Sequence, residues 1–299
     1  MAVFTTTSGA RAIAVYTAVL AGCTDVVVET GISYDDRFSV AKLDVYSPPP
    51  TDALRPAVVV IHGGGWHEGA GLERDGMADH AQRLAEAGYV AFNISYRLVP
   101  SGGQFPHAVQ DCICALAWIR GHAGDYGIDP DRIGALGYSA GGHLVSMLGT
   151  AASDPIVAPD CEAGQTTPVN AVVSGAGPQD MGLLLAVDTV SEFVGGSRAE
   201  HPELYVQASP ISYVAPGAPP FLFIHGDSDW FVDIEHSTRM AAALEAVGTD
   251  HHLLEIPGGG HLWNRGTSGS TWDLGMSIDT PQAWAATIDF LDHEIGPVP

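Results

Sequence analysis

The chain has 299 residues, of which 46% are hydrophobic and 16% are charged, so it can bury the core of one large α/β domain. Its formal charge is −23, with Lys42 as the single lysine. This excess of acidic groups repels polyanions, which argues against nucleic acid and anionic membranes as partners.

The first 24 residues allow two interpretations. An apolar run, residues 12–22, follows Arg11 and leads into Leu-Ala-Gly-Cys23, which resembles the cleavage site of a bacterial lipoprotein. Export with lipidation at Cys23 is therefore one alternative. A basic region of one arginine is small for a leader, so we expect a retained N-terminal arm on a cytoplasmic protein. No later stretch is long and apolar enough to span a bilayer.

The hydrophobic pattern alternates between strands and helices along the chain. Residues 25–30 and 40–46 flank a polar turn, which predicts an antiparallel hairpin at one edge of a sheet. The strands expected after it are 57–61, 89–95, 133–136, 169–173, 221–224 and 252–256. The helices expected are 75–87, 107–120, 234–246 and 281–293. This alternation predicts an α/β fold, a mostly parallel twisted sheet of about eight strands with helices on both faces.

Residues 25–299 are expected to form a single domain, because no repeat or interdomain linker interrupts the pattern. Two stretches are too long for simple connections. Residues 181–218, with one expected helix near 183–193, are typical of a small lid or pocket wall. Residues 153–168 form a second, polar insertion without clear periodicity.

The four cysteines, Cys23, Cys112, Cys114 and Cys161, form no metal-ligand pattern. Cys112 and Cys114 are two residues apart in an expected helix, so they point to different sides and cannot share a metal. We therefore expect buried free thiols.

A serine follows the expected strand 133–136. The run Gly137-Tyr-Ser139-Ala-Gly141 joins that strand to a stretch with helical spacing. Glycines two residues to either side of Ser139 remove side chains that would collide in a sharp turn. Such a turn raises the hydroxyl at the carboxyl edge of the sheet, as a nucleophile requires. The same five-residue pattern also arises by chance, so the serine alone does not establish a site.

A glycine run follows strand 57–61 at the same edge of the sheet. His62-Gly-Gly-Gly-Trp66 lets the backbone approach a ligand closely and turn its N–H groups into a cavity. Beside a nucleophilic serine, these N–H groups and that of Ala140 could stabilise an oxyanion. The alternative is a flexible turn.

Serine chemistry also needs a base, and the base needs a carboxylate to orient it. The last two expected strands are followed by His225-Gly-Asp-Ser-Asp229 and by Pro257-Gly-Gly-Gly-His261. Asp229 is the better candidate acid because it lies farther around its turn, which leaves Asp227 to brace the loop. His261 is the candidate base because it follows the acid and is expected on a glycine-rich loop just past a strand.

Together these motifs resemble the α/β-hydrolase superfamily. The segments that carry the resemblance are Val59-Val-Ile-His-Gly-Gly-Gly-Trp66, Tyr126-Gly-Ile-Asp-Pro-Asp-Arg-Ile133, Gly137-Tyr-Ser-Ala-Gly-Gly142, Ala208-Ser-Pro210, Phe223-Ile-His-Gly-Asp-Ser-Asp229 and Gly260-His261. The most similar branch contains hormone-sensitive-lipase-like and bacterial feruloyl-esterase-like carboxylesterases. The roles that this resemblance implies are Ser139 as nucleophile, Asp229 as acid, His261 as base, and Gly64, Gly65 and Ala140 as oxyanion hole. The chain departs from the pattern at Val232, which Asp233 follows where relatives often have proline.

The resemblance implies a serine carboxylesterase that hydrolyses small, short-chain acyl or aromatic-acid esters through an acyl-enzyme, without metal or cofactor. The alternatives are an N-formylkynurenine formamidase, whose relatives also carry His-Gly-Gly-x-Trp, and a non-catalytic binding protein. The expected partner is a small ester, and a homodimer is one option for assembly. The aromatic residues Trp66, Tyr138, Phe193, Tyr205 and Tyr213 either line an apolar pocket or belong to the core.

Overall fold

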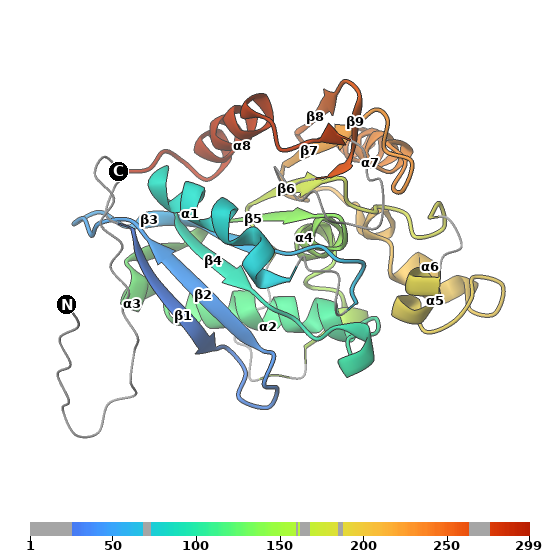
Figure 1. The fold of residues 1–299 in the computed structure, drawn as a ribbon, viewed down its shortest axis with the longest axis horizontal. Helices are drawn as coiled ribbons and strands as arrows, with labels where there is room; N and C mark the ends of the chain where they lie inside the picture. The colour runs from blue at the N-terminus through green and yellow to red at the C-terminus, as the bar shows by residue number, and fades with distance from the viewer. Residues whose placement is uncertain (1–25, 68–72, 160, 162–167, 185–187, 263–275) are drawn as a thin grey trace.

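The fold is built on one large sheet with strand order β1-β2-β4-β3-β5-β6-β7-β8 (Figure 1). The computed structural model describes residues 26–67, 73–159, 161, 168–184, 188–262 and 276–299. The strands of this sheet are β1 (Val27–Ser33), β2 (Lys42–Ser47), β3 (Arg55–Ile61), β4 (Val90–Ile94), β5 (Ile128–Tyr138), β6 (Ala171–Gly175), β7 (Phe221–Gly226) and β8 (His251–Ile256). The pairs β1–β2 and β2–β4 are antiparallel and the other pairs are parallel. The predicted edge hairpin and mostly parallel sheet are confirmed.

The inner strands are buried on both faces, which explains their nearly continuous apolar sequences. Every residue of β3 is buried. Val59 and Ile61 pack into the cluster on one face of the sheet, whereas Val58 and Val60 pack into the cluster on the other. β5 is longer than predicted because Ile128 already pairs with β3, ahead of an irregularity in the register.

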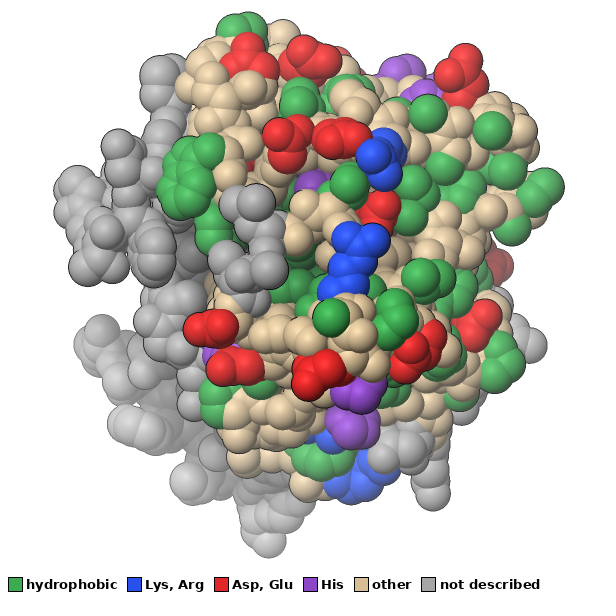
Figure 2. All heavy atoms as spheres, turned by 90° about the vertical axis from the view of Figure 1, so that its right-hand side faces the viewer, with side chains coloured by type: hydrophobic (Ala, Val, Ile, Leu, Met, Phe, Trp, Pro, Cys, Tyr) green, Lys and Arg blue, Asp and Glu red, His purple; other side chains and the backbone are tan. Residues whose placement is uncertain are grey.

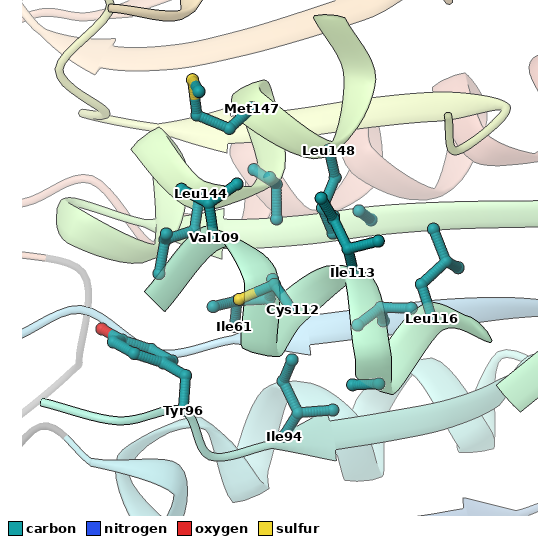
Figure 3. Close-up of a cluster of buried hydrophobic side chains, with 14 of the residues drawn as sticks. Ile61, Ile94, Tyr96, Val109, Cys112, Ile113, Leu116, Leu144, Met147 and Leu148 are labelled. Atoms are coloured by element: carbon teal, nitrogen blue, oxygen red, sulfur yellow. The ribbon is translucent and has the colours of Figure 1, made fainter. Parts of the chain in front are cut away.

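Helices cover both faces of the sheet. The helices are α1 (Ala78–Glu86), α2 (His107–Gly121), α3 (Ala123–Tyr126), α4 (Ala140–Thr150), α5 (Asp188–Val194), α6 (Pro202–Gln207), α7 (Glu235–Ala246) and α8 (Pro281–Glu294). The 3₁₀ turns are η1 (Arg74–Met77), η2 (Val99–Ser101), η3 (Pro155–Val157) and η4 (Pro210–Tyr213). Side chains of α2, α4 and α7 join one cluster, and those of α1 and α8 join the other. Figure 3 shows the first cluster, where Val109 and Cys112 of α2 and Leu144 of α4 gather near Ile61.

Local sequence predicted the first residue of one helix correctly and that of another incorrectly. α8 begins at the predicted Pro281 because the Thr280 hydroxyl accepts a hydrogen bond from the Ala283 N–H at 3.0 Å. The expected helix 75–87 instead divides into η1 and α1. The Gly76 N–H donates to the Glu73 carbonyl, which makes the first turn tighter than an α-helix.

The insertion 181–218 contains α5, α6 and η4 rather than the one helix expected near 183–193. α5 ends before Gly195, whose φ of 97° is a left-handed conformation that favours glycine. Pro202 then begins α6. The Phe105 N–H donates to the Phe193 carbonyl at 2.8 Å, which fastens the end of α5 to the segment that leads into α2.

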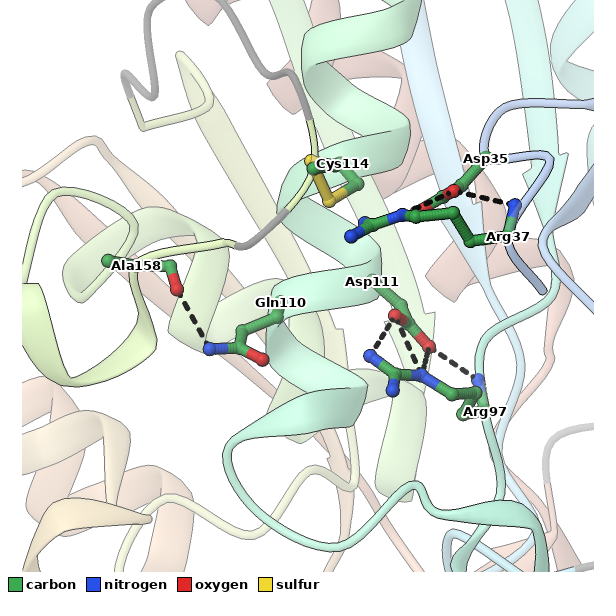
Figure 4. The surroundings of a disulfide bond; sticks show 8 residues. Asp35, Arg37, Arg97, Gln110, Asp111, Cys114 and Ala158 are labelled. Carbon is green, nitrogen blue, oxygen red and sulfur yellow. Dashed lines mark hydrogen bonds and ion pairs between the residues drawn. A yellow bond between two sulfur atoms is a disulfide. The ribbon is translucent and has the colours of Figure 1, made fainter.

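The expectation of free thiols is wrong for two cysteines. Cys114 of α2 and Cys161 form a disulfide, with their Cα atoms 6.1 Å apart (Figure 4). Near it, the Gln110 amide donates to the Ala158 carbonyl at 2.8 Å and adds a second link between α2 and the polar insertion. The bonded cysteines lie 47 residues apart, and the second is in a stretch without periodicity, so no spacing pattern indicated the bond. Cys112 is a buried free thiol, as expected.

Acidic side chains are spread over the face near α5, α6 and α7, where Lys and Arg side chains are few (Figure 2). This view agrees with the formal charge of −23. Among the described residues, no helix has the length and apolar character needed to cross a membrane. Residues 1–24, with both interpretations of Cys23, lie outside the described residues.

Candidate active site

Ser139 lies in a sharp turn between β5 and α4. Its φ of 54° is in the left-handed region, which is strained for a residue with a Cβ. A Cβ on Gly137 would overlap the Gly141 carbonyl, and a Cβ on Gly141 would overlap the Ile61 carbonyl at the end of β3. The two glycines are therefore required by close backbone packing, and the predicted strand–turn–helix around Ser139 is present.

The structure brings Ser139, His261 and Asp229 into one hydrogen-bonded chain. Ser139 Oγ lies 2.9 Å from His261 Nε2, and His261 Nδ1 lies 2.7 Å from Asp229 Oδ2. A carboxylate only accepts, so Nδ1 carries the hydrogen and Nε2 is left to accept from the hydroxyl. The three side chains are buried, with exposed fractions of 6%, 3% and 5%. This is the arrangement that the sequence predicted for nucleophile, base and acid.

The Asp229 carboxylate is held by several donors. Its Oδ1 accepts from the N–H groups of Phe231 and Val232, each at 2.9 Å. Burial by itself would raise the pKa of this carboxyl group, but the hydrogen bonds from His225 and His261 and the backbone hold the pKa well below its usual value. Asp229 is therefore ionised in the range where the base would work.

Asp227 has the bracing role predicted for it. It is exposed, and its Oδ1 accepts from the Gly258 N–H at 2.7 Å, which ties the loop after β7 to the loop after β8. The two segments also meet at the backbone, because a Cβ on Gly226 would overlap the Gly259 carbonyl. These contacts fix the acid-bearing turn against the segment that carries His261.

His261 lies on a short strand rather than on the glycine-rich loop that we predicted. β9 (Gly259–Leu262) pairs in parallel with β10 (Met276–Ser277). The glycine run supplies one left-handed turn residue, Gly258 with φ 69°, and the chain becomes extended directly afterwards. The contact with the end of β7 explains this difference, since it holds the chain straight at Gly259.

The glycine run after β3 lies against the serine turn. A Cβ on Gly63 would come 2.8 Å from the Tyr138 carbonyl and 3.2 Å from Ser139 Cβ, so the backbone of this run is close to the candidate nucleophile. Gly64 and Gly65 follow with φ of 103° and 61°. The turn closes with a hydrogen bond from the His67 N–H to the Gly64 carbonyl at 3.1 Å. Gly64 and Gly65 therefore lie in a hydrogen-bonded turn close to Ser139.

Trp66 and Tyr138 are both buried, with exposed fractions of 3% and 4%. The Trp66 ring stacks on Phe193 of α5 at 4.3 Å and meets His143 of α4 edge-on at 5.3 Å. The Tyr138 ring lies 5.3 Å from the His261 ring. Trp66 thus packs among core side chains and Tyr138 packs beside the candidate base, and the pocket assignment of both residues stays a prediction. α5 covers the glycine turn, with Thr189 3.6 Å from a Cβ built on Gly65.

Two further residues contact the candidate site, and the sequence analysis assigned neither of them. The Phe231 ring lies 5.1 Å from the His261 ring. His225 is fully buried at the end of β7, with Nε2 3.4 Å from Asp229 Oδ2. The sequence carried a signal for His225, because a buried histidine in an otherwise apolar strand requires hydrogen-bond partners.

The BD-FAE family model matches residues 43–244, more than half of the chain. The chain belongs to the BD-FAE family. It is 35% identical over 214 residues to "Esterase LipC" and 30% identical over 258 residues to "Esterase LipQ", both of Mycobacterium tuberculosis. These matches cover 69% and 83% of this chain but 52% and 58% of the relatives, so the BD-FAE chain spans about half the length of the curated relatives it matches.

Solved structures agree with the α/β-hydrolase fold. A truncated carbohydrate esterase from gut microbiota superposes with a TM-score of 0.73 at 25% identity, covering 90% of this chain and 96% of that chain. Esterase Est2 of Thermogutta terrifontis superposes with a TM-score of 0.73 at 23% identity, covering 93% and 95% of the two chains. The second likeness bears on the fold alone.

Proposed function

We propose that this BD-FAE family member is a serine carboxylesterase. The observation that carries the proposal is the buried hydrogen-bonded chain from Ser139 through His261 to Asp229. The names of its relatives, esterases of Mycobacterium tuberculosis among them, support the same reaction class. The proposed substrates are small esters of short-chain or aromatic acids.

The proposed reaction is a two-step acyl transfer. His261 takes the Ser139 proton as Oγ attacks the ester carbonyl, and the C–O bond to the alcohol then breaks as His261 protonates the leaving oxygen. In the second step, His261 activates a water that cleaves the acyl-enzyme. The N–H groups of Gly64, Gly65 and Ala140 stabilise the oxyanion in both steps.

The deciding experiment replaces the proposed nucleophile. We expect Ser139→Ala to lower kcat on p-nitrophenyl acetate and butyrate by about 10⁴-fold, because it removes the hydroxyl that lies 2.9 Å from His261 Nε2. Ser146→Ala is the matched control, since Ser146 lies in α4, which follows Ser139, and its hydroxyl donates to the Gly142 carbonyl at 2.8 Å. Equal activity of Ser139→Ala and wild type would overturn the proposal.

The substrate class is tested with the same pair of proteins. Rates on p-nitrophenyl acetate, butyrate and decanoate are compared with the rate on N-formylkynurenine. A preference for the short esters is expected. A dominant rate on the formamide would instead identify an amidase that uses the same three residues.

We infer that the chain matures in an oxidising compartment, which favours the export alternative over a cytoplasmic location. The support is the disulfide between Cys114 and Cys161, a bond that persists outside the reducing cytosol. Peptide mapping of protein taken from its native cells, with thiols blocked at lysis, would detect the linked peptides. Free Cys114 and Cys161 there would restore the cytoplasmic location.

We also propose that residues 25–299 act as one domain and that the insertion 181–218 forms a wall of the substrate site. α5 of this insertion lies over the glycine turn, where His67 pairs with Glu192 at 3.0 Å. The homodimer stays a prediction, which sedimentation equilibrium would test.

A further inference from the structure

We propose that His225 is a positioning residue for the acid of the triad, holding the Asp229 carboxylate in the orientation that receives His261. This inference rests on the proposed function, because it assigns a role within the same site. His225 does not touch Ser139, so it would act on the reaction through Asp229.

The hydrogen-bond partners of His225 fix which ring nitrogen is protonated. Nε2 lies 2.8 Å from the Val232 carbonyl and 3.4 Å from Asp229 Oδ2. Both partners are acceptors, so Nε2 carries a hydrogen and shares it between them. One ring N–H therefore connects both ends of the turn 229–232, and the carboxylate and the carbonyl are held together.

The other ring nitrogen is held by α7. His225 Nδ1 lies 2.7 Å from Ser237 Oγ. With a hydrogen on Nε2, Nδ1 can accept and the Ser237 hydroxyl can donate. Ser237 is buried as well, and its hydroxyl is a partner for Nδ1 in the tautomer that the two acceptors at Nε2 require. The polar chain thus runs from Ser237 through His225, Asp229 and His261 to Ser139.

Several titratable groups surround His225. Its side chain is fully buried. His236 of α7 interacts with it electrostatically, and burial lowers the pKa of His236 to about 4, so His236 is neutral at neutral pH. His236 also interacts with Asp180, Asp233 and Asp229. Asp229 is the ionised group in direct contact with His225, and its charge is shared between the donors on its two oxygens.

Loss of the His225 N–H has a specific expected effect. Asp229 Oδ2 would keep His261 as its one remaining donor, so more negative charge would face the imidazole. The protonated base would be stabilised, and the acid limb of the kcat/KM profile would move to higher pH. The carboxylate would also turn more freely, which lowers kcat while KM stays near its original value, since His225 does not touch substrate.

The test compares His225→Leu, which removes the donor, with His225→Gln, whose amide can place an N–H near the position of Nε2. We expect kcat of His225→Leu to fall about tenfold or more, with the acid limb displaced upward. His225→Gln should recover most of the wild-type kcat and most of the wild-type position of the acid limb. His80→Leu is the control for losing a buried histidine, because His80 lies in α1 in the other half of the core, near Asp279.

A second readout needs no substrate. His261 Nδ1 and Asp229 Oδ2 lie 2.7 Å apart, so the proton between them should give a downfield ¹H resonance in wild type and in His225→Gln. In His225→Leu this resonance should be shifted or absent. Ser237→Ala, a milder change, should show a partial shift if His225→Leu does not fold. An unmoved resonance together with an unmoved pH profile in a folded His225 variant would overturn the inference. Absence of ester turnover in the wild-type protein would overturn the proposed function alone.

Discussion

Gly141 has no room for a side chain, because the Ile61 and His62 carbonyls of the neighbouring strand end lie against its Cα. Its place in the serine turn is decided by contact between main chains rather than by turn conformation alone. A single methyl group here would push α4 away from β3 and move Ser139 with it. The glycine is thus part of how the hydroxyl meets His261 at 2.9 Å.

We therefore predict that Gly141→Ala destabilises the protein by about 2–4 kcal/mol and lowers kcat at least tenfold. Thermal unfolding and initial rates on p-nitrophenyl acetate would measure both effects. Gly121→Ala is the matched control, because a Cβ at that last residue of α2 meets nothing within 4 Å. Similar melting of the two variants would show that the turn can relax around the methyl group.

At the scale of elements, the disulfide fastens α2 to the polar insertion that precedes β6. It closes a loop of 47 residues, and constraining a loop of that length in the unfolded chain stabilises a protein by about 4 kcal/mol. We predict that reductant lowers the melting temperature of wild type, whereas Cys161→Ser melts lower and does not respond to reductant. A wild-type melting curve unaffected by reductant would argue that the bond adds nothing to stability.

The elements also show what sequence can predict. Strands such as β3 and helices such as α8 were predictable, because continuous apolar runs, a Thr cap and a first-turn proline act locally. The pairing of Cys114 with Cys161 and the extended conformation at His261 were not. Both features depend on contacts between segments distant in sequence. The disulfide joins residues 47 apart, and the extended conformation at His261 depends on the backbone contact between Gly226 and Gly259. The three proposed triad residues were predictable because each follows an expected strand in the order that the resemblance implies, whereas the proposed role of His225 depends on tertiary contacts.

At the scale of the whole molecule, four buried histidines make stability depend on pH. Burial lowers the pKa values of His62, His80, His143 and His236 to about 4, below their usual 6.5. As the pH falls through about 6.5, the unfolded chain takes up protons at these rings and the folded chain does not. The free energy of unfolding therefore decreases as the pH falls from about 6.5 toward 4.

We predict that urea midpoints of wild type fall steeply between pH 7 and pH 5. His143→Gln should show a shallower fall, because it removes one of these rings, and the difference between the two slopes isolates one histidine from the changing repulsion among the acidic groups. His143 suits this test because its Nδ1 is buried without a hydrogen-bond partner, so protonation there finds no acceptor. Parallel slopes for the two proteins would contradict the prediction.

The backbone contact between Gly226 and Gly259 has a consequence for how the family can diversify. Because β7 and β9 meet main chain to main chain, the segments that carry the proposed acid and base are fastened to each other. The proposed wall, within residues 181–218, belongs to a separate stretch of chain. Under the proposed function, substitutions in that wall would change which esters enter without altering proton transfer, so new substrate preferences could evolve while the catalytic chemistry is inherited unchanged.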